Sequence, residues 1–349
     1  MLMKRILLST SLLGAGLLSS TQAQVAYTAP SGYIKVEVPA ATATGPSFTT
    51  FSVSLLNEVE FSSSVTINSD FTAGTNNDPG TQTISVADVT WTANQWTTVP
   101  YLAFISTAGD PANSIEPSEE FFTVMSNTAN TLTIATDFNL LTTGRPAADQ
   151  FPATTTLVLR KANTVASVLN QASPALDESD RAYIWEGSGF NTYFRSGSSW
   201  RRTAFFPPVD NEIVYPDRGI FLQRSVQTPT TFTFFGDVPV KSQGTILPGQ
   251  SLDFVGNRYP VGGTVAELGL NNLPGWVNGV SGDQVYIWRS NNWAQYYYTG
   301  SSWRKVGQFP PAGGDSVAPN SAIFVSRVGT STNSVSNLAT PLPYNPTAP

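Results

Sequence analysis

The sequence contains no histidine and no cysteine among its 349 residues, and only 12% of its residues are charged. Without histidine, Ser-His-Asp and Cys-His catalysis are excluded, and so are zinc sites of the ordinary kind, because imidazole is the commonest general base and transition-metal ligand. Without cysteine, disulfides and thiolate chemistry are excluded. Carboxylate catalysis, lysine or tyrosine chemistry, and a calcium site of oxygen ligands remain open. We expect no cofactor.

Basic residues are scarce as well. The chain has 18 Lys and Arg against 24 Asp and Glu, a formal net charge of −6. A nucleic-acid partner is not expected, because phosphate binding needs a basic face. Long apolar runs are missing after the N-terminal segment, so we also expect no transmembrane anchor.

Residues 1–23 have the pattern of a secretory signal peptide. Lys4 and Arg5 form a charged start, an apolar stretch from Ile6 to Leu18 follows, and small residues precede a cleavage point after Ala23. The alternative is an uncleaved anchor, for which the apolar stretch is short. The pattern predicts a secreted protein, extracellular or at the cell surface, with the periplasm as the other destination.

The composition predicts an all-β fold. Short runs rich in Val, Thr and aromatic residues alternate with turn-forming clusters, which is typical of barrels and sandwiches. We divide the chain into an N-terminal β domain (24–155) with a barrel- or sandwich-like fold, two β repeats (156–245 and 246–343) and a Pro-rich tail (344–349). In "GYIKVEV", the alternation places Ile34 and Val36 toward the core.

The two repeats are an internal duplication. Residues 180–224 and 283–327 agree at 18 of 45 positions without a gap, including "YIW", "GSSWR" and "FPP". Upstream, "TVASVLN" matches "TVAELGL" at an offset of 100. We expect the two units to pack on one another with pseudo-twofold symmetry.

Each repeat is expected to contain one short helix. Thr264 and Glu267 fit a capping box, whereas the first repeat has Thr164 followed by Ser167. The helix signal is therefore stronger in the second repeat.

The shared aromatic residues suggest a hairpin in each repeat. With Ser196-Gly197 as a two-residue turn, Tyr193 lies opposite Trp200; by the same arithmetic, Tyr296 lies opposite Trp303. "FPP" is expected to be a turn that ends a strand, because proline stops ladder pairing.

Two interpretations of these aromatics stay open. They either form two hydrophobic cores, or they form exposed platforms that stack on sugars. For the second interpretation the candidate ligand-binding residues are Tyr183, Trp185, Tyr193, Trp200, Tyr286, Trp288, Trp293, Tyr297 and Trp303.

Few charged residues are kept in both repeats. Asp180 and Asp283 correspond to one another, as do Arg224 and Arg327 and, in sign only, the acids Glu212 and Asp315. We expect structural ion pairs or carboxylates that tie loops, and the alternative is a carboxylate pair for glycoside hydrolysis. A further acidic stretch could bind calcium, although a solvated loop is favoured; its acids are Asp110, Glu116, Glu119 and Glu120.

The segments "GYIKVEVPA", "SNTANTLTIATD" and "YIW…Y…GSSWRR…FPP" together resemble an uncharacterised family of secreted proteins of environmental Gram-negative bacteria. The resemblance covers most of the chain beyond the signal peptide. It implies secretion of a self-contained β-rich protein, and it brings no activity and no functional residue.

Three functions are considered. The first is a non-catalytic structural or adhesive protein of the cell surface or extracellular matrix, which could self-associate through exposed strand edges. The second is a protein that binds extracellular polysaccharide through the duplicated Tyr and Trp motifs. The third, a carboxylate-only glycoside hydrolase, is the least favoured, since no catalytic motif is present.

Overall fold

The computed structural model describes residues 30–67, 80–106, 119–136, 154–187, 189–241, 245–257, 260–329 and 334–336. The expected signal peptide (1–23) and tail (344–349) lie outside these residues, as do Asp110 and Glu116 of the acidic stretch. In the described part the chain is almost entirely β-structure, which confirms the predicted fold class.

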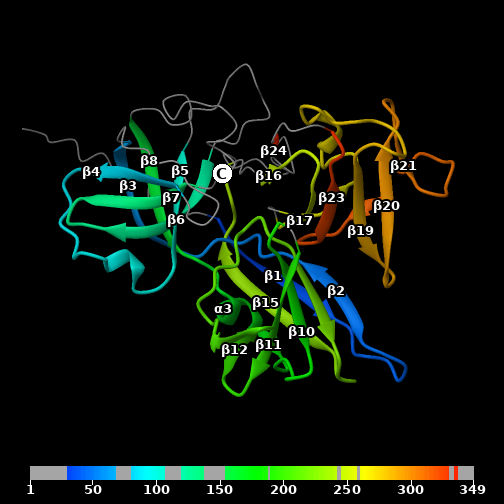
Figure 1. Cartoon of the computed structure of the whole chain (residues 1–349), viewed down its shortest axis with the longest axis horizontal. Coiled ribbons are helices and arrows are strands. Elements are labelled where there is room, and N and C mark those ends of the chain that lie inside the picture. The colour runs from blue at the N-terminus through cyan, green and yellow to red at the C-terminus, as the bar shows by residue number, and fades with distance from the viewer. Residues whose placement is uncertain are drawn as a thin grey trace, which may run out of the picture.

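Six strands close into a barrel, drawn at the left of Figure 1. Their order around the barrel is β3-β4-β7-β6-β5-β8, and every pair is antiparallel. The strands are β3 (Val59–Ile67), β4 (Gly80–Val86), β5 (Tyr101–Ser106), β6 (Glu119–Asn127), β7 (Thr131–Thr136) and β8 (Thr154–Lys161), with a 3-10 turn η1 (Gln95–Thr97) before β5. Val, Ile and Leu fill much of the interior, and Trp91, Trp96 and Tyr101 pack edge to face in the same core.

A second unit packs two sheets around one core. The larger has six strands in the order β13-β12-β11-β10-β14-β2, and the smaller has three in the order β1-β15-β9. The strands are β1 (Ser31–Val38), β2 (Ser47–Phe51), β9 (Ala172–Ser173), β10 (Arg181–Trp185), β11 (Phe190–Ser196), β12 (Ser199–Arg202), β13 (Phe205–Pro208), β14 (Ile220–Arg224) and β15 (Thr230–Asp237). On β1, Ile34 is buried and Val36 packs against the core, as the alternation predicts.

A third unit repeats this arrangement at the right of Figure 1. Its main sheet has the order β17-β23-β19-β20-β21, with two two-stranded ladders beside it. The strands are β16 (Thr245–Leu247), β17 (Leu252–Gly256), β18 (Gly263–Thr264), β19 (Gln284–Arg289), β20 (Asn292–Tyr298), β21 (Trp303–Lys305), β22 (Ser316–Val317), β23 (Ala322–Ser326) and β24 (Ser334–Ser336).

The second and third units have the same strand connections, and we call them the first and second copies. We call β11-β12 in the first copy and β20-β21 in the second the central hairpin. In both copies the first two strands pair with two strands that follow this hairpin: β1 with β15 and β2 with β14 in the first, β16 with β24 and β17 with β23 in the second. Residues 31–51 therefore share sheets with the first copy, although a sequence division at 155 separates them from it. In chain order the barrel is an insertion between β2 and the rest of the first copy.

The helices differ from the expectation. In the first copy Thr164 and Ser167 form a reciprocal capping box and α3 (Val165–Leu169) follows. In the second copy Thr264 and Glu267 make the capping hydrogen bonds, but only a turn follows, and the short helix there is the 3-10 helix η2 (Leu270–Asn272). Gly269, with a φ of 66°, stands at the place of Leu169 and ends the turn.

The predicted hairpin pairing is wrong in detail. The turn is Gly197-Ser198, so Tyr193 pairs with Arg202 and Arg195 with Trp200. Gly197 has a φ of 64° and supplies the first central residue of the turn, whereas the prediction placed it second. The shift is an even number of residues, so Tyr193 and Trp200 still point to the same core. In the second copy Tyr296 likewise pairs with Lys305 and not with Trp303.

The two copies are joined by reciprocal contacts. Ser52 N–H donates to the Asn320 carbonyl at 2.7 Å, and Gly256 N–H donates to the Asp217 carbonyl at 2.9 Å. Asp217 and Asn320 correspond across the duplication, and Ser52 and Gly256 lie at matching ends of β2 and β17. Such reciprocity is what a twofold relation between the copies produces.

Candidate functional site

Three of the nine candidate residues lie in the cores of the copies. Tyr193 and Trp200 are buried in the first core, and Trp303 is buried in the second. The indole N–H of Trp200 donates to Asn170 at 2.9 Å, and that of Trp303 donates to Asn271 at 3.3 Å. Their polar atoms are thus satisfied inside the protein, and their ring faces are not available to a ligand.

The duplicated acids are partners of buried tyrosines. The Tyr193 hydroxyl donates to Glu212 at 2.6 Å, and the Tyr296 hydroxyl donates to Asp315 at 2.7 Å. Burial, and then the hydrogen bond to Asp315, raises the pKa of Tyr296 to about 12. The same two causes raise the pKa of Tyr193 further above its usual value. This explains why both copies keep an acid at this position.

Three more candidates form the aromatic cluster between the copies: Trp185, Trp288 and Trp293. The Trp185 ring lies 5.6 Å from that of Phe324, and the corresponding pair, Trp288 and Phe221, lies at 5.2 Å. These rings contribute to the packing of one copy on the other by burying apolar area and by edge-to-face contact.

The remaining candidates, Tyr183, Tyr286 and Tyr297, are half-buried on the outer faces of the main sheets. Tyr183 hydroxyl donates to Gln223 at 2.7 Å, and Tyr286 hydroxyl donates to Gln284 at 2.6 Å. The two tyrosines are equivalent in the duplication, but their glutamine partners are not, because Gln223 corresponds to Ser326 and Gln284 to Arg181. These three tyrosines therefore keep partial access to solvent, as Trp288 and Trp293 do.

The sequence analysis missed two strongly exposed phenylalanines. Phe206 is 86% exposed and Phe309 is 93% exposed, and they occupy equivalent positions in the two "FPP" segments. In the first copy the segment is β13, a short strand at the sheet edge where proline is tolerated, and not the turn that we expected. The available signal was the identity of this Phe in both copies beside two prolines.

In the first copy, basic side chains lie near the exposed phenylalanine, and one of them, Arg202, also pairs with Glu212 at 3.2 Å. The Arg201 guanidinium donates to the Phe206 carbonyl, and the Arg202 guanidinium lies 4.9 Å from the Phe205 ring centre. Arg304 and Lys305 occupy the corresponding places in the second copy. We call the two segments, Phe205–Pro208 and 308–311, the FPP tips.

The Asp and Arg residues shared by both copies form buried ion pairs. Asp180 pairs with Arg224, and Asp283 pairs with Arg327 at 3.0 Å. Both oxygens of each carboxylate also accept backbone hydrogen bonds, from Ser225 in the first copy and Val328 in the second among others. These acids tie loops together, as the structural interpretation of the repeated charges expects, and all their oxygens are occupied.

Two other acids have perturbed protonation, Asp253, which is buried, and Glu186, which is exposed. Desolvation raises the pKa of both, and Arg218 opposes the rise in both cases. They lie near the junction of the copies but are not duplicated. Among the described residues no group of three or more acids is arranged to hold a metal ion.

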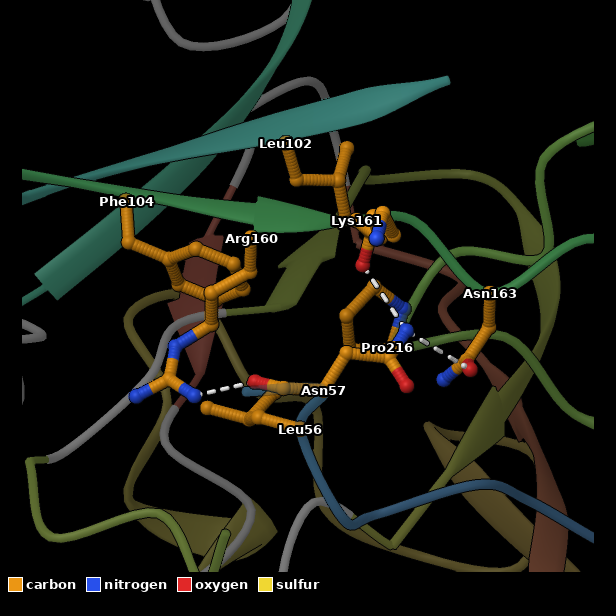
Figure 2. Close-up of a pocket in the computed structure, with 8 residues that line it drawn as sticks. All are labelled: Leu56, Asn57, Leu102, Phe104, Arg160, Lys161, Asn163 and Pro216. Carbon is orange, nitrogen blue, oxygen red and sulfur yellow. Dashed lines mark hydrogen bonds between the residues drawn. The ribbon is translucent and has the colours of Figure 1, made fainter. Parts of the chain in front are cut away.

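A small pocket lies between the barrel and the first copy (Figure 2). Asn57 donates to the Lys161 carbonyl at 2.8 Å and to Asn163 at 3.2 Å, while Arg160 donates to the Asn57 carbonyl. Arg160 also pairs with Asp237 at 2.6 Å. The polar groups around the pocket therefore bond one another and fasten the barrel to the first copy.

Comparison with known proteins finds no matching family model, no matching curated protein and no matching solved structure. The family resemblance described above stays a prediction. Within the described ranges, no helix combines the length and apolar character needed to cross a membrane.

Proposed function

We propose that this protein is a secreted, non-catalytic structural or adhesive protein of the cell surface or extracellular matrix. The observation that supports this most directly is the pair of FPP tips. Single exposed apolar residues are common on proteins, but here the same large ring is presented at equivalent places of both copies. A pair of equal contact points suits attachment, because two weak contacts on one molecule bind far more strongly together than either does alone.

The chemistry of the tips favours surfaces that combine apolar and negatively charged groups. Two basic residues precede each tip in the sequence, Arg201 and Arg202 in the first copy and Arg304 and Lys305 in the second, and Arg202 also pairs with Glu212. An apolar ring with adjacent cations suits an interface where one side is apolar and the other carries anions.

The test is adhesion of the chain from residue 24 to surfaces of defined chemistry. We expect the double variant Phe206→Ser/Phe309→Ser to lose most of the retention on phenyl-coated beads and on vesicles containing anionic lipid, and each single variant to lose part of it. Val280→Ser is the matched control, because Val280 is also exposed but lies outside the tips. Equal retention of the double variant and the unsubstituted chain would contradict the proposal.

Polysaccharide binding is the second candidate, and the outer-face tyrosines favour it. Tyr183 and Tyr286 combine a partly accessible ring with a glutamine partner, a pairing suited to a sugar face and its hydroxyl groups. In a titration with soluble polysaccharides followed by intrinsic fluorescence, Tyr183→Ala/Tyr286→Ala should weaken saturable binding. Absence of saturable binding by the unsubstituted chain would remove this candidate.

A further inference from the structure

Strand β1 forms one edge of the sheet β1-β15-β9. It pairs with β15 along its whole length, from Ser31 to Val38, without a bulge. No other strand in the described part of the chain pairs with its opposite side. An edge of eight residues is long, and between Ser31 and Val38 it has no proline, no bulge and no inward-pointing charge. Of the usual protective devices it carries only charged side chains, Lys35 and Glu37.

The alternation of hydrogen bonds between β1 and β15 shows which backbone groups of β1 point away from β15. Val238 N–H donates to the Pro30 carbonyl at 2.7 Å, so the even-numbered residues of β1 are the ones that bond to β15. The N–H and C=O groups of Tyr33, Lys35 and Glu37 therefore point to the free edge. Three consecutive odd-numbered residues provide a ladder for another antiparallel strand.

The exposed face of β1 is also self-complementary in charge. Lys35 and Glu37 point to solvent and lie on either side of Val36, with their side chains paired at 3.0 Å within the molecule. In an antiparallel pair of two β1 strands centred on Val36, Lys35 of each molecule faces Glu37 of the other, and these two residues form the reciprocal hydrogen bonds. Tyr33 then faces Pro39 of the other molecule, which has no N–H to donate. An antiparallel pair centred on Lys35, or an in-register parallel pair, would instead place like charges opposite one another, which is unfavourable.

Two large rings lie on the same exposed face. Tyr33 is 71% exposed and Phe235, its partner on β15, is 73% exposed, with ring centres 6.3 Å apart. Rings this exposed beside an open edge gain contact area when the sheet continues into a second molecule.

We propose that β1 pairs with β1 of a second molecule of this protein, in the antiparallel register centred on Val36, to form one continuous sheet across the dimer. This deepens the structural role proposed above by naming a partner and a surface. The FPP tips lie on other strands, so the adhesion test and the pairing test can fail independently.

The test uses charge reversal and sedimentation equilibrium of the chain from residue 24. Lys35→Glu leaves two glutamates on the edge and Glu37→Lys leaves two lysines, so each variant alone should dimerise at least about tenfold more weakly than the unsubstituted chain. An equimolar mixture of the two variants, and the double variant Lys35→Glu/Glu37→Lys, should both recover dimerisation, because opposite charges then face one another again. Both positions are exposed, and circular dichroism checks that the fold is kept.

Three results would overturn the proposal. The first is an unsubstituted chain that stays monomeric at 0.5 mM, about the upper limit for a specific contact of this size. The second is dimerisation of each single variant with unchanged affinity. The third is an equimolar mixture that associates no better than its components, since charge pairing across this edge is what the register requires.

Discussion

Glu120 shows how one buried carboxyl can make the stability of this protein depend on pH. It lies on β6 opposite Ile105 and on the same side of the strand as Phe122, so it points into the barrel. One of its carboxylate oxygens is buried without a hydrogen-bond partner. Burial raises the pKa of Glu120 to about 7, because the charged form is poorly solvated there.

The sign of the effect follows from linkage. Because the folded protein holds this proton more tightly than the unfolded chain does, the contribution of Glu120 to stability is greatest below pH 4.5, the ordinary value for a glutamate. That contribution falls as the pH rises from there to about 7, and it is constant above.

We predict that the change Glu120→Gln raises the free energy of unfolding more at pH 8 than at pH 4, each compared with the unsubstituted chain at the same pH. The glutamine cannot ionise, so the gain should be on the order of 3 kcal/mol across this range. Urea unfolding of both proteins at pH 4, 6 and 8 measures it. Glu58→Gln, at an exposed position, is the control and should leave the pH profile unchanged. Parallel profiles for Glu120→Gln and the unsubstituted chain would show that this carboxyl is not desolvated.

The turn of the central hairpin depends on glycine in both copies. Gly197 and Gly300 have φ values of 64° and 99°, a region that L-residues rarely adopt. Open space surrounds Gly197, since a Cβ atom built there meets nothing within 4 Å. The conformation of the backbone, and not crowding, is therefore the reason for glycine at this position.

We predict that Gly197→Ala lowers the free energy of unfolding by about 1 kcal/mol, the usual cost of left-handed backbone in a residue with a Cβ atom. Gly45→Ala is the matched control, because a Cβ atom there also meets nothing and its φ lies outside the left-handed region. That change should be neutral or slightly stabilising. Chemical unfolding followed by tryptophan fluorescence compares the two, and equal effects would argue against backbone strain as the cause.

At the scale of elements, local sequence patterns predict which side chains of one strand or hairpin face the core. The alternation of β1 correctly places Ile34 and Val36 inside, and the shared aromatics correctly place Tyr193 and Trp200 on one face. The exact pairing could not be obtained from the sequence, because one glycine can stand at either central position of a turn. The capping box at Thr264 is likewise correct as a set of hydrogen bonds, but a box does not decide how far a helix continues.

The candidate site was harder to predict, because an aromatic residue that is identical in both copies can be either buried in a core or exposed on the surface. Trp200 and Trp303 are identical in the copies because they fill equivalent cores, whereas Phe206 and Phe309 are identical and exposed. What distinguishes the two cases is the tertiary environment of each ring, which a single sequence does not contain.

At the scale of the whole molecule, the main departure from the sequence division is the origin of β1 and β2. They pair with β14 and β15, which follow them by more than a hundred residues and lie beyond the whole barrel. Strand pairing over such a distance leaves no periodic signal in the chain. The duplication is visible in the sequence only where both copies are uninterrupted. In the first copy the barrel separates β1 and β2 from the remaining strands.

The barrel enters and leaves the first copy at adjacent points. Asn57, just before β3, donates to Asn163, just after β8, at 3.2 Å. Close ends are the usual property of an inserted unit, and they allow it to be removed without moving the host. The second copy supports the same conclusion, because six residues (257–262) connect β17 to β18 there.

We therefore predict that replacing residues 58–162 by a Gly/Ser linker of about four residues leaves both copies folded. The barrel touches the first copy through Leu102 and Phe104, which pack with Leu56 and Ile213, so their loss should lower the free energy of unfolding by roughly 1–3 kcal/mol. Cooperative unfolding, with Trp200 and Trp303 still buried by fluorescence, is the expected result. A chain that collapses without a cooperative transition would mean that the first copy needs the barrel to bring β1 and β2 to their partners, and that the insertion is part of how the protein folds.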